Sequence, residues 1–297
     1  MSDTHFGLDD MCDETTFARD RRIATMTRRR FGALTAAAGA VMLLPKAAKA
    51  LDVTFSEVDV ETPDGTADCY FARPVEDAHP GVVIWPDARG MRGAYRDMAV
   101  RLAEHGYSVL VVNPYYRRQR GQVLPDDTDP RQGNAMSVLG PLLADLSPET
   151  ERTDAIAAIE WLDAHENVAD DRKLGTIGFC LGGPATFRTA AEAPTRVGAA
   201  ASFHGVRLVT DEPTSPHRLV PRLDAQFLIA IAEDDDARDP DAKNVLRAAF
   251  DEAEVSAEIE VYPAMHSWMT TDSAVHDPAQ AERGWNRMLA LFAAALA

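Results

Sequence analysis

The six residues Gly178-Phe179-Cys180-Leu181-Gly182-Gly183 join a mainly apolar run, residues 174–179, to an amphipathic stretch, residues 184–193. A reactive side chain with a glycine two places before it and two places after it is typical of a sharp strand-to-helix turn. The glycines are needed because side chains at their positions would clash across the turn. We therefore predict a strand over 174–179, a helix over 184–193, and between them Cys180 as a nucleophile whose sulfur the turn projects above the sheet.

Apolar runs and amphipathic stretches alternate on both sides of this turn. We predict strands at 82–85, 107–113, 174–179, 197–203, 227–232 and 257–262, and helices at 95–105, 153–165, 184–193, 240–253 and 278–296. Buried strands that alternate with helices indicate an α/β fold with a mostly parallel central sheet and helices on both faces. Residues 51–71 alternate more openly, which suggests an antiparallel edge. In such sheets the chemistry lies beyond the carboxyl ends of the strands.

Two later strands are followed by residues that would complete a catalytic triad. The acidic segment Glu233-Asp234-Asp235-Asp236 follows the strand at 227–232, and His266 follows the strand at 257–262. A nucleophile turn of this kind requires an acid and then a histidine later in the chain. His266 would take the thiol proton and later activate water, while the acid would fix the histidine tautomer. Each residue alone has a structural explanation, but the ordered set at three strand ends favours catalysis.

The surroundings of Cys180 favour a reactive thiolate. The helix that begins behind the turn presents its positive end to the sulfur, and a nearby histidine acts in the same direction. The backbone N–H of Leu181 is then placed to stabilise an oxyanion.

These motifs resemble the dienelactone hydrolase family of α/β-hydrolases, over roughly residues 55–295. The resemblance implies the α/β-hydrolase fold, a triad of Cys180, Asp235 and His266, and hydrolysis of a lactone or small ester through an acyl-thioester. The family's acid lies three residues after the small residue that ends its strand, here Ala232, which selects Asp235. Asp236 remains an alternative. The histidine is followed by Ser-Trp, whereas the family usually has glycine and an aromatic residue there.

The resemblance also implies three substrate-binding residues. Asp87 occupies the place of an acid that interacts with the resting thiol, and Ala88 would supply the second oxyanion N–H. Arg118 matches an arginine that binds a substrate carboxylate, for which two parallel hydrogen bonds are well suited. Asp87 as a simple turn residue, and Arg118 as part of a solvated basic face, are the alternatives.

Composition limits the partners. A chain of 297 residues with 46% apolar residues can bury one sizeable core, while a net charge of −17 argues against nucleic acid. The sequence contains neither ligand spacing for a metal nor a phosphate-binding loop, so no cofactor is implied. The expected partner is a small-molecule ester or lactone. A carboxylesterase or other acyl hydrolase of the same fold is the first alternative. A non-catalytic exported binding protein is the second, and a Cys69–Cys180 disulfide would favour it.

Residues 1–50 have the features of a Tat-type signal peptide, and residues 51–297 would form the hydrolase domain. Thr27-Arg28-Arg29-Arg30-Phe31 is followed by an apolar run at 33–45 and by Ala48-Lys49-Ala50, a small-residue cleavage pattern. The run is shorter than the roughly 20 residues that a spanning helix needs. We therefore expect export through the Tat machinery, to the periplasm or beyond, without a stable membrane span after cleavage. A membrane-anchoring N-terminal helix is the alternative.

Overall fold

The computed structural model describes residues 50–126, 128 and 133–297. Almost all of the predicted signal peptide therefore lies outside the described residues. Eight strands form one sheet: β1 (Val53–Thr62), β2 (Gly65–Pro74), β3 (Gly81–Trp85), β4 (Ser108–Val112), β5 (Leu174–Phe179), β6 (Val197–Phe203), β7 (Gln226–Ala232) and β8 (Ala257–Tyr262). Their order is β1-β2-β4-β3-β5-β6-β7-β8.

The sheet is parallel from β4 to β8, and an antiparallel hairpin, β1 and β2, forms one edge. This arrangement confirms the predicted α/β class and the predicted antiparallel edge. Strand β5 leads into the strand-to-helix turn at Cys180, which we call the elbow. It lies in the middle of the sheet, between β3 and β6, so the residue that follows it is surrounded by the ends of neighbouring strands. All six residues of β5 are buried, as expected for a strand covered on both faces.

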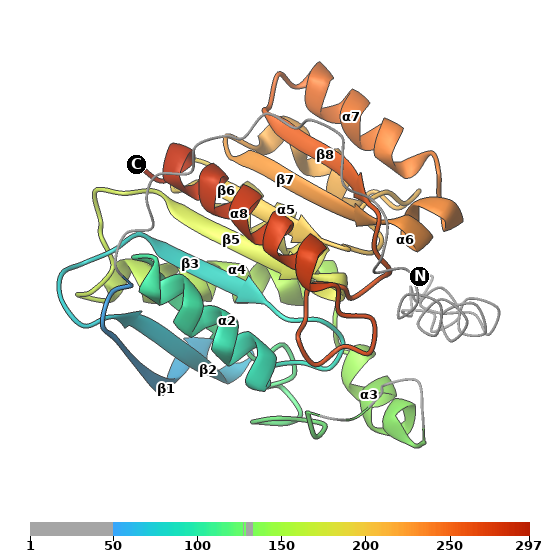
Figure 1. The fold of residues 1–297 in the computed structure, drawn as a ribbon. Helices are drawn as coiled ribbons and strands as arrows, with labels where there is room; N and C mark the ends of the chain where they lie inside the picture. Colours follow the sequence, from blue (N-terminus) through green and yellow to red (C-terminus); the bar gives the residue numbers. More distant parts are fainter. Residues whose placement is uncertain (1–49, 127, 129–132) are drawn as a thin grey trace, which may run out of the picture. The chain divides into compact units, whose positions relative to one another are not determined.

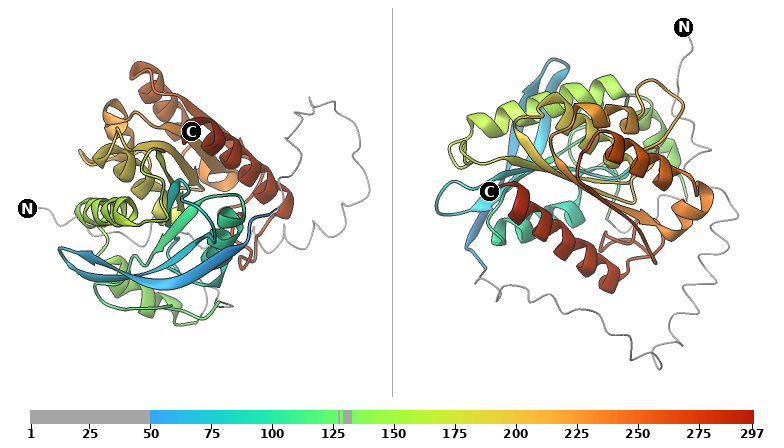
Figure 2. Two further views of the ribbon diagram at one scale, coloured as in Figure 1. Left: turned by 90° about the vertical axis from the view of Figure 1, so that its left-hand side faces the viewer. Right: turned by 90° about the horizontal axis from the view of Figure 1, so that it is seen from above.

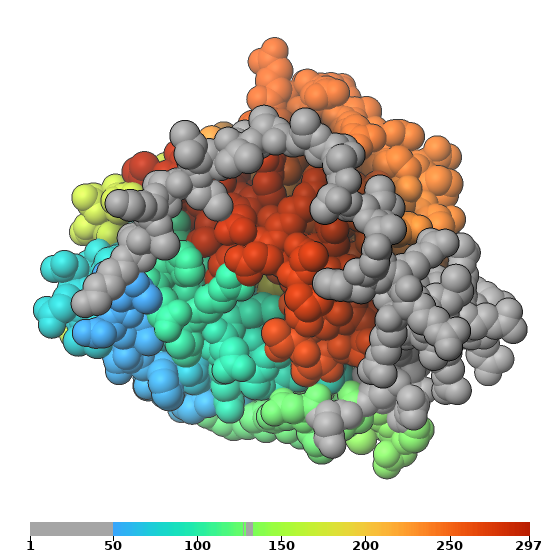
Figure 3. Space-filling model, in the orientation of Figure 1, coloured from blue at the N-terminus to red at the C-terminus, as the bar shows by residue number. Residues whose placement is uncertain are grey.

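Helices cover both faces of this sheet. Helices α2 (Gly93–Glu104) and α8 (Pro278–Ala295) lie on one face, and α4 (Pro148–Ala164), α5 (Gly183–Glu192) and α7 (Ala242–Glu252) lie on the other (Figures 1 and 2). Figure 3 shows the red surface of the C-terminal segment against the green surface near residue 100, where Arg101 of α2 binds Glu282 of α8. Neighbouring strand residues contribute to opposite layers: Val83 packs with the α4 and α5 side, Val82 with the α2 and α8 side.

The observed elements differ from the predicted ones mainly in polar segments. Helix α4 begins at Pro148, before the apolar pattern, because Ser147 and Thr150 form a reciprocal capping box around Pro148. Four short helices in the described residues were not predicted: α3 (Ala135–Leu143), α6 (Glu233–Arg238) and two 3₁₀ helices, η2 (Cys180–Gly182) and η3 (Pro216–Arg222). Among the described helices, none has the length and apolar character needed to cross a membrane.

Candidate active site

The turn after β5 has the geometry that its glycines predicted. Cys180 has a φ of 52°, in the left-handed region that side chains other than glycine rarely adopt. A Cβ atom on Gly178 would lie 2.0 Å from the carbonyl oxygen of Gly182, and one on Gly182 would lie 2.2 Å from that of Trp85. The turn therefore packs tightly on its own backbone and on β3, and this packing holds Cys180 in a strained conformation.

The structure brings Cys180, Asp235 and His266 together from the ends of β5, β7 and β8. His266 Nδ1 lies 2.7 Å from Asp235 Oδ2, and the His266 backbone N–H donates to Asp234 Oδ1 at 2.8 Å. Asp236 points elsewhere and binds Lys243. Of the two acids left open by the sequence, the geometry therefore places Asp235 on the histidine. With Nδ1 engaged, Nε2 is the ring nitrogen left for Cys180, whose thiol interacts with His266 and contributes to its raised pKa.

Local charges keep this pair ready for proton transfer. Burial disfavours a charged imidazole, but Asp235 and then Cys180 outweigh it and raise the pKa of His266 well above its usual range. Burial likewise opposes the Asp235 charge, yet the charge of His266 and its hydrogen bond lower the pKa of this carboxyl. Asp235 is consequently ionised, and His266 can hold a proton taken from the thiol.

The loop after β3 holds Ala88 beside the nucleophile turn. The Asp87 backbone N–H donates to the Tyr95 hydroxyl, and the Gly90 N–H donates to the Asp87 carbonyl. The Tyr115 hydroxyl donates to the Ala88 carbonyl at 2.6 Å, which fixes that peptide from the other side. In the described part of the chain the Ala88 N–H has no acceptor, so it is available to an oxyanion, as is expected of the Leu181 N–H.

Asp87 is held by a cluster of buried charges that the sequence did not predict. Both its carboxylate oxygens bind Arg92, at 2.7 and 2.9 Å, and Arg92 also binds Asp272 at 2.6 Å. Arg89 binds Asp272 at 2.6 Å as well. Because Asp272 lies on the loop that follows His266, the cluster connects the loop carrying Ala88 to the loop carrying His266. Arg92 is close to Asp87 in sequence, but Asp272 is distant and no sequence signal pointed to it.

Arg118 lies at the surface, where its guanidinium binds Asp145 and its side chain is 55% exposed. It does not line the pocket beside the elbow. Its predicted role in binding a substrate carboxylate stays a prediction that this placement does not favour.

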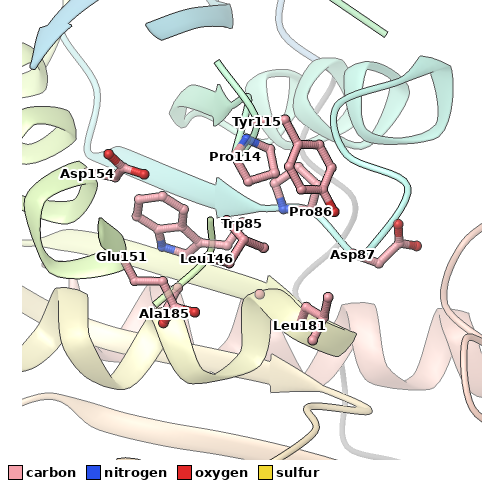
Figure 4. Close-up of a pocket in the computed structure, with 11 residues that line it drawn as sticks. Trp85, Pro86, Asp87, Pro114, Tyr115, Leu146, Glu151, Asp154, Leu181 and Ala185 are labelled. Atoms are coloured by element: carbon pink, nitrogen blue, oxygen red, sulfur yellow. The ribbon is translucent and has the colours of Figure 1, made fainter. Parts of the chain in front are cut away.

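A pocket adjoins the nucleophile turn (Figure 4). Its lining is apolar and acidic: Trp85, Pro86, Asp87, Pro114, Tyr115, Leu146, Glu151, Asp154, Leu181, Gly182 and Ala185. Figure 4 shows Asp87 and Leu181 at one end and Glu151 and Asp154 toward the other. Glu151 binds Arg188 and Asp154 binds Arg117, so the pocket's acids are paired with cations behind its wall.

Neither a disulfide nor a metal cluster is found in the described residues. Cys69 and Cys180 are both free thiols, with Cys69 buried in β2. No group of three or more histidine, cysteine, aspartate or glutamate side chains in the described segments has the arrangement of a metal site.

The fold and the arrangement at its strand ends define an α/β-hydrolase. A profile of the dienelactone hydrolase family matches residues 67–296, and the chain belongs to that family, whose members are hydrolases of lactones or esters.

Known relatives cover most of the chain. It is 30% identical to a Salmonella typhi protein provisionally named a carboxymethylenebutenolidase, over 75% of this chain and 81% of the relative. It is 25% identical to a Bradyrhizobium protein provisionally named a 2-oxo-3-(5-oxofuran-2-ylidene)propanoate lactonase, over 78% and 91%. The crystal structure of a provisionally assigned dienelactone hydrolase from Klebsiella pneumoniae has a TM-score of 0.70 and 26% identity, covering 82% of this chain and 99% of that one.

Proposed function

We propose that this protein hydrolyses a lactone or small ester with a Cys180-His266-Asp235 triad. The observation that carries the proposal is the meeting of three side chains at three strand ends: Asp235 is hydrogen-bonded to His266, and His266 interacts with Cys180. The names of the relatives, which refer to butenolide and furanone lactones, support this substrate class.

The reaction would proceed in two halves. Cys180 Sγ bonds to the carbonyl carbon while its proton passes to His266 Nε2, and the Ala88 and Leu181 N–H groups receive the developing oxyanion. Breaking the C–O bond forms the thioester, and the imidazolium gives its proton to the leaving oxygen. Water then attacks the thioester, losing a proton to His266, and the thiol is regenerated as the acid departs. A lactone yields a hydroxy acid by the same steps.

The test is turnover of p-nitrophenyl acetate and of a dienelactone by the full-length protein and by Cys180→Ala. We expect both substrates to be hydrolysed, and both Cys180→Ala and prior alkylation with iodoacetamide to abolish turnover. Activity that survives loss of Cys180 would refute the mechanism. Hydrolysis of the acetate ester alone would favour a carboxylesterase, whereas a folded protein inert on both would favour the binding-protein alternative.

The same substrate pair tests Arg118. A carboxylate-binding role requires Arg118→Ala to lower kcat/KM for the anionic dienelactone relative to the neutral acetate. Because Arg118 is paired with Asp145 at the surface, we expect the ratio to change by less than about 2-fold, as for other exposed ion pairs.

We also propose export through the Tat machinery, with residues 1–50 as the leader. The twin arginine Arg28-Arg29, the apolar run that follows it and Ala48-Lys49-Ala50 support this assignment. In a bacterial host, wild-type protein should be recovered outside the cytoplasm with Leu51 as its first residue. Replacing Arg28 and Arg29 together by lysine should retain the uncut precursor inside. Equal export of both forms would contradict the assignment.

A further inference from the structure

His204, at the end of β6, is buried in a way that hydrogen bonding does not explain. Its side chain is 0% exposed, and within the described part of the chain neither Nδ1 nor Nε2 has a hydrogen-bond partner. A buried polar group left without a partner costs about 1–3 kcal/mol, so an apolar ring would be cheaper at this position. Such an exception in a native structure calls for another reason.

The ring of His204 stands directly against the ring of His266. Their centroids are 4.9 Å apart and their planes make 63°, an edge-to-face arrangement. On its other side His204 meets Trp268 at 5.1 Å and 71°, and Trp268 stacks on Tyr262 at 5.4 Å. The catalytic imidazole is therefore the last member of a row of packed rings that begins at the end of β8.

The backbone around His204 reaches the nucleophile as well. His204 has a φ of 41°, and its N–H donates to Ala230 of β7 at 2.8 Å. Two residues later the Val206 N–H donates to the carbonyl of Cys180 at 3.1 Å. This turn packs so closely on the elbow helix that a Cβ atom on Gly183 would lie 2.6 Å from Gly205 Cα. Residues 204–206 therefore contact His266 through the His204 side chain and Cys180 through the backbone N–H of Val206.

The ring is also kept uncharged. Burial, and then the charge of His266, lower the pKa of His204 to about 3, against the opposite effects of Asp235 and Asp87. A neutral ring can remain against His266 when that residue becomes an imidazolium, whereas a second cation there would repel it.

We propose that His204 is a positioning residue, whose ring holds the His266 imidazole between Asp235 and Cys180 while its turn holds the Cys180 backbone. The proposal rests on the proposed function for its kinetic consequence. Small misplacements of reacting groups cost up to about 100-fold in rate, which is the scale expected here.

The test compares His204→Ala, His204→Phe and His165→Ala in the full-length protein. His165 is a matched control, because it is the C-cap residue of α4 and its ring packs against Phe71 and Trp161, at 4.6 and 4.9 Å, instead of His266. We expect His204→Ala to lower kcat for p-nitrophenyl acetate by about 10- to 100-fold with KM changed by less than about 3-fold. His165→Ala should leave kcat near wild type. His204→Phe keeps a ring and should recover most of the lost rate.

Alkylation of Cys180 by iodoacetamide, followed against pH, gives a readout that needs no turnover. Loosening His266 weakens its support of the thiolate, so His204→Ala should move the alkylation midpoint to higher pH, and His204→Phe should move it back. An unchanged midpoint in His204→Ala, or a folded His204→Phe as slow as His204→Ala, overturns the proposal. A shifted midpoint in a protein whose wild type hydrolyses neither ester supports it and refutes only the proposed substrate class.

Discussion

Asp235 and Asp236 are neighbours in the chain but contact different partners. Asp235 binds His266, whereas Asp236 binds Lys243. We expect Asp235→Asn to lower kcat for p-nitrophenyl acetate by roughly 10³- to 10⁴-fold, because an amide there favours the wrong histidine tautomer. Asp236→Asn is the matched control and should stay within about 3-fold of wild type. If steady-state kinetics instead show the large loss of kcat in Asp236→Asn and little change in Asp235→Asn, Asp236 is the acid that acts with His266.

At the residue scale, candidate site residues could be predicted where the prediction depended on residue type and order. Cys180 stood between glycines after an apolar run, and His266 followed the last predicted strand, so both could be chosen as candidates from the chain alone. The resemblance selected Asp235 but left Asp236 open, because four consecutive acids follow β7 and the turn of α6 decides which of them faces the histidine. The contact between His204 and His266 was equally invisible, since it depends on how two strand ends lie in space.

At the scale of elements, the elbow depends on two backbones approaching closely. Gly182→Ala would place Cβ 2.2 Å from the Trp85 carbonyl oxygen, and neither backbone can yield without moving β3 or α5. We expect a loss of about 3 kcal/mol in the free energy of unfolding, measured in urea. Gly140→Ala in α3 is the control, because no atom lies within 4 Å of the added methyl, and it should stabilise by about 0.5–1 kcal/mol. If Gly182→Ala and Gly140→Ala change the free energy of unfolding equally, the close backbone contact at Gly182 is contradicted.

The charge cluster that connects two loops should make stability depend on pH. Burial opposes the charge of Asp87, but Arg92 lowers its pKa to about 2. A carboxyl whose pKa is lower in the folded state stabilises the fold fully above its ordinary pKa near 3.8, and this contribution is lost as pH falls through 2. Asp87→Asn should therefore lower the free energy of unfolding by about 3 kcal/mol at pH 7. In urea unfolding measured against pH, the difference in this free energy between the variant and wild type should shrink progressively below about pH 4.

The control for this measurement is Asp59→Asn, which removes an exposed partner of Arg120 and should cost less than about 1 kcal/mol at any pH. If the difference in the free energy of unfolding between wild type and Asp87→Asn stays constant from pH 7 to pH 3, the cluster does not stabilise the ionised form of Asp87.

Strands were easier to predict than helices for a physical reason. The buried strands carry continuous apolar runs, and β5, β6 and β8 begin and end where the sequence predicted. Helix ends depend on capping groups and on polar residues, which the apolar pattern does not record, as Ser147 and Pro148 at the start of α4 illustrate. Helix α3 lies in a segment where no helix was predicted, because its apolar run is too short to distinguish a helix from a loop.

At the scale of the whole molecule, the net charge of −17 should act on substrates before they bind. An anionic dienelactone is repelled at long range, and salt screens that repulsion. We expect kcat/KM for the dienelactone to rise several-fold between about 0.03 and 0.3 M salt, with p-nitrophenyl acetate unaffected as the neutral control. A fall with salt for the dienelactone would instead reveal a cationic site that captures its carboxylate.

Left-handed backbone recurs at the ends of β5, β6 and shortly after β8, at Cys180, His204 and Ser267, with φ values of 52°, 41° and 75°. Glycine adopts this conformation without penalty, but at Cys180 and His204 it would also remove a buried side chain and leave a cavity, which costs more than the strain it relieves. Ser267 is only half-buried, so selection for heat resistance alone should enrich glycine there and not at the other two positions. If selection that also demands turnover still accepts glycine at Ser267, the serine is merely tolerated, and if it rejects glycine, the serine is kept for catalysis.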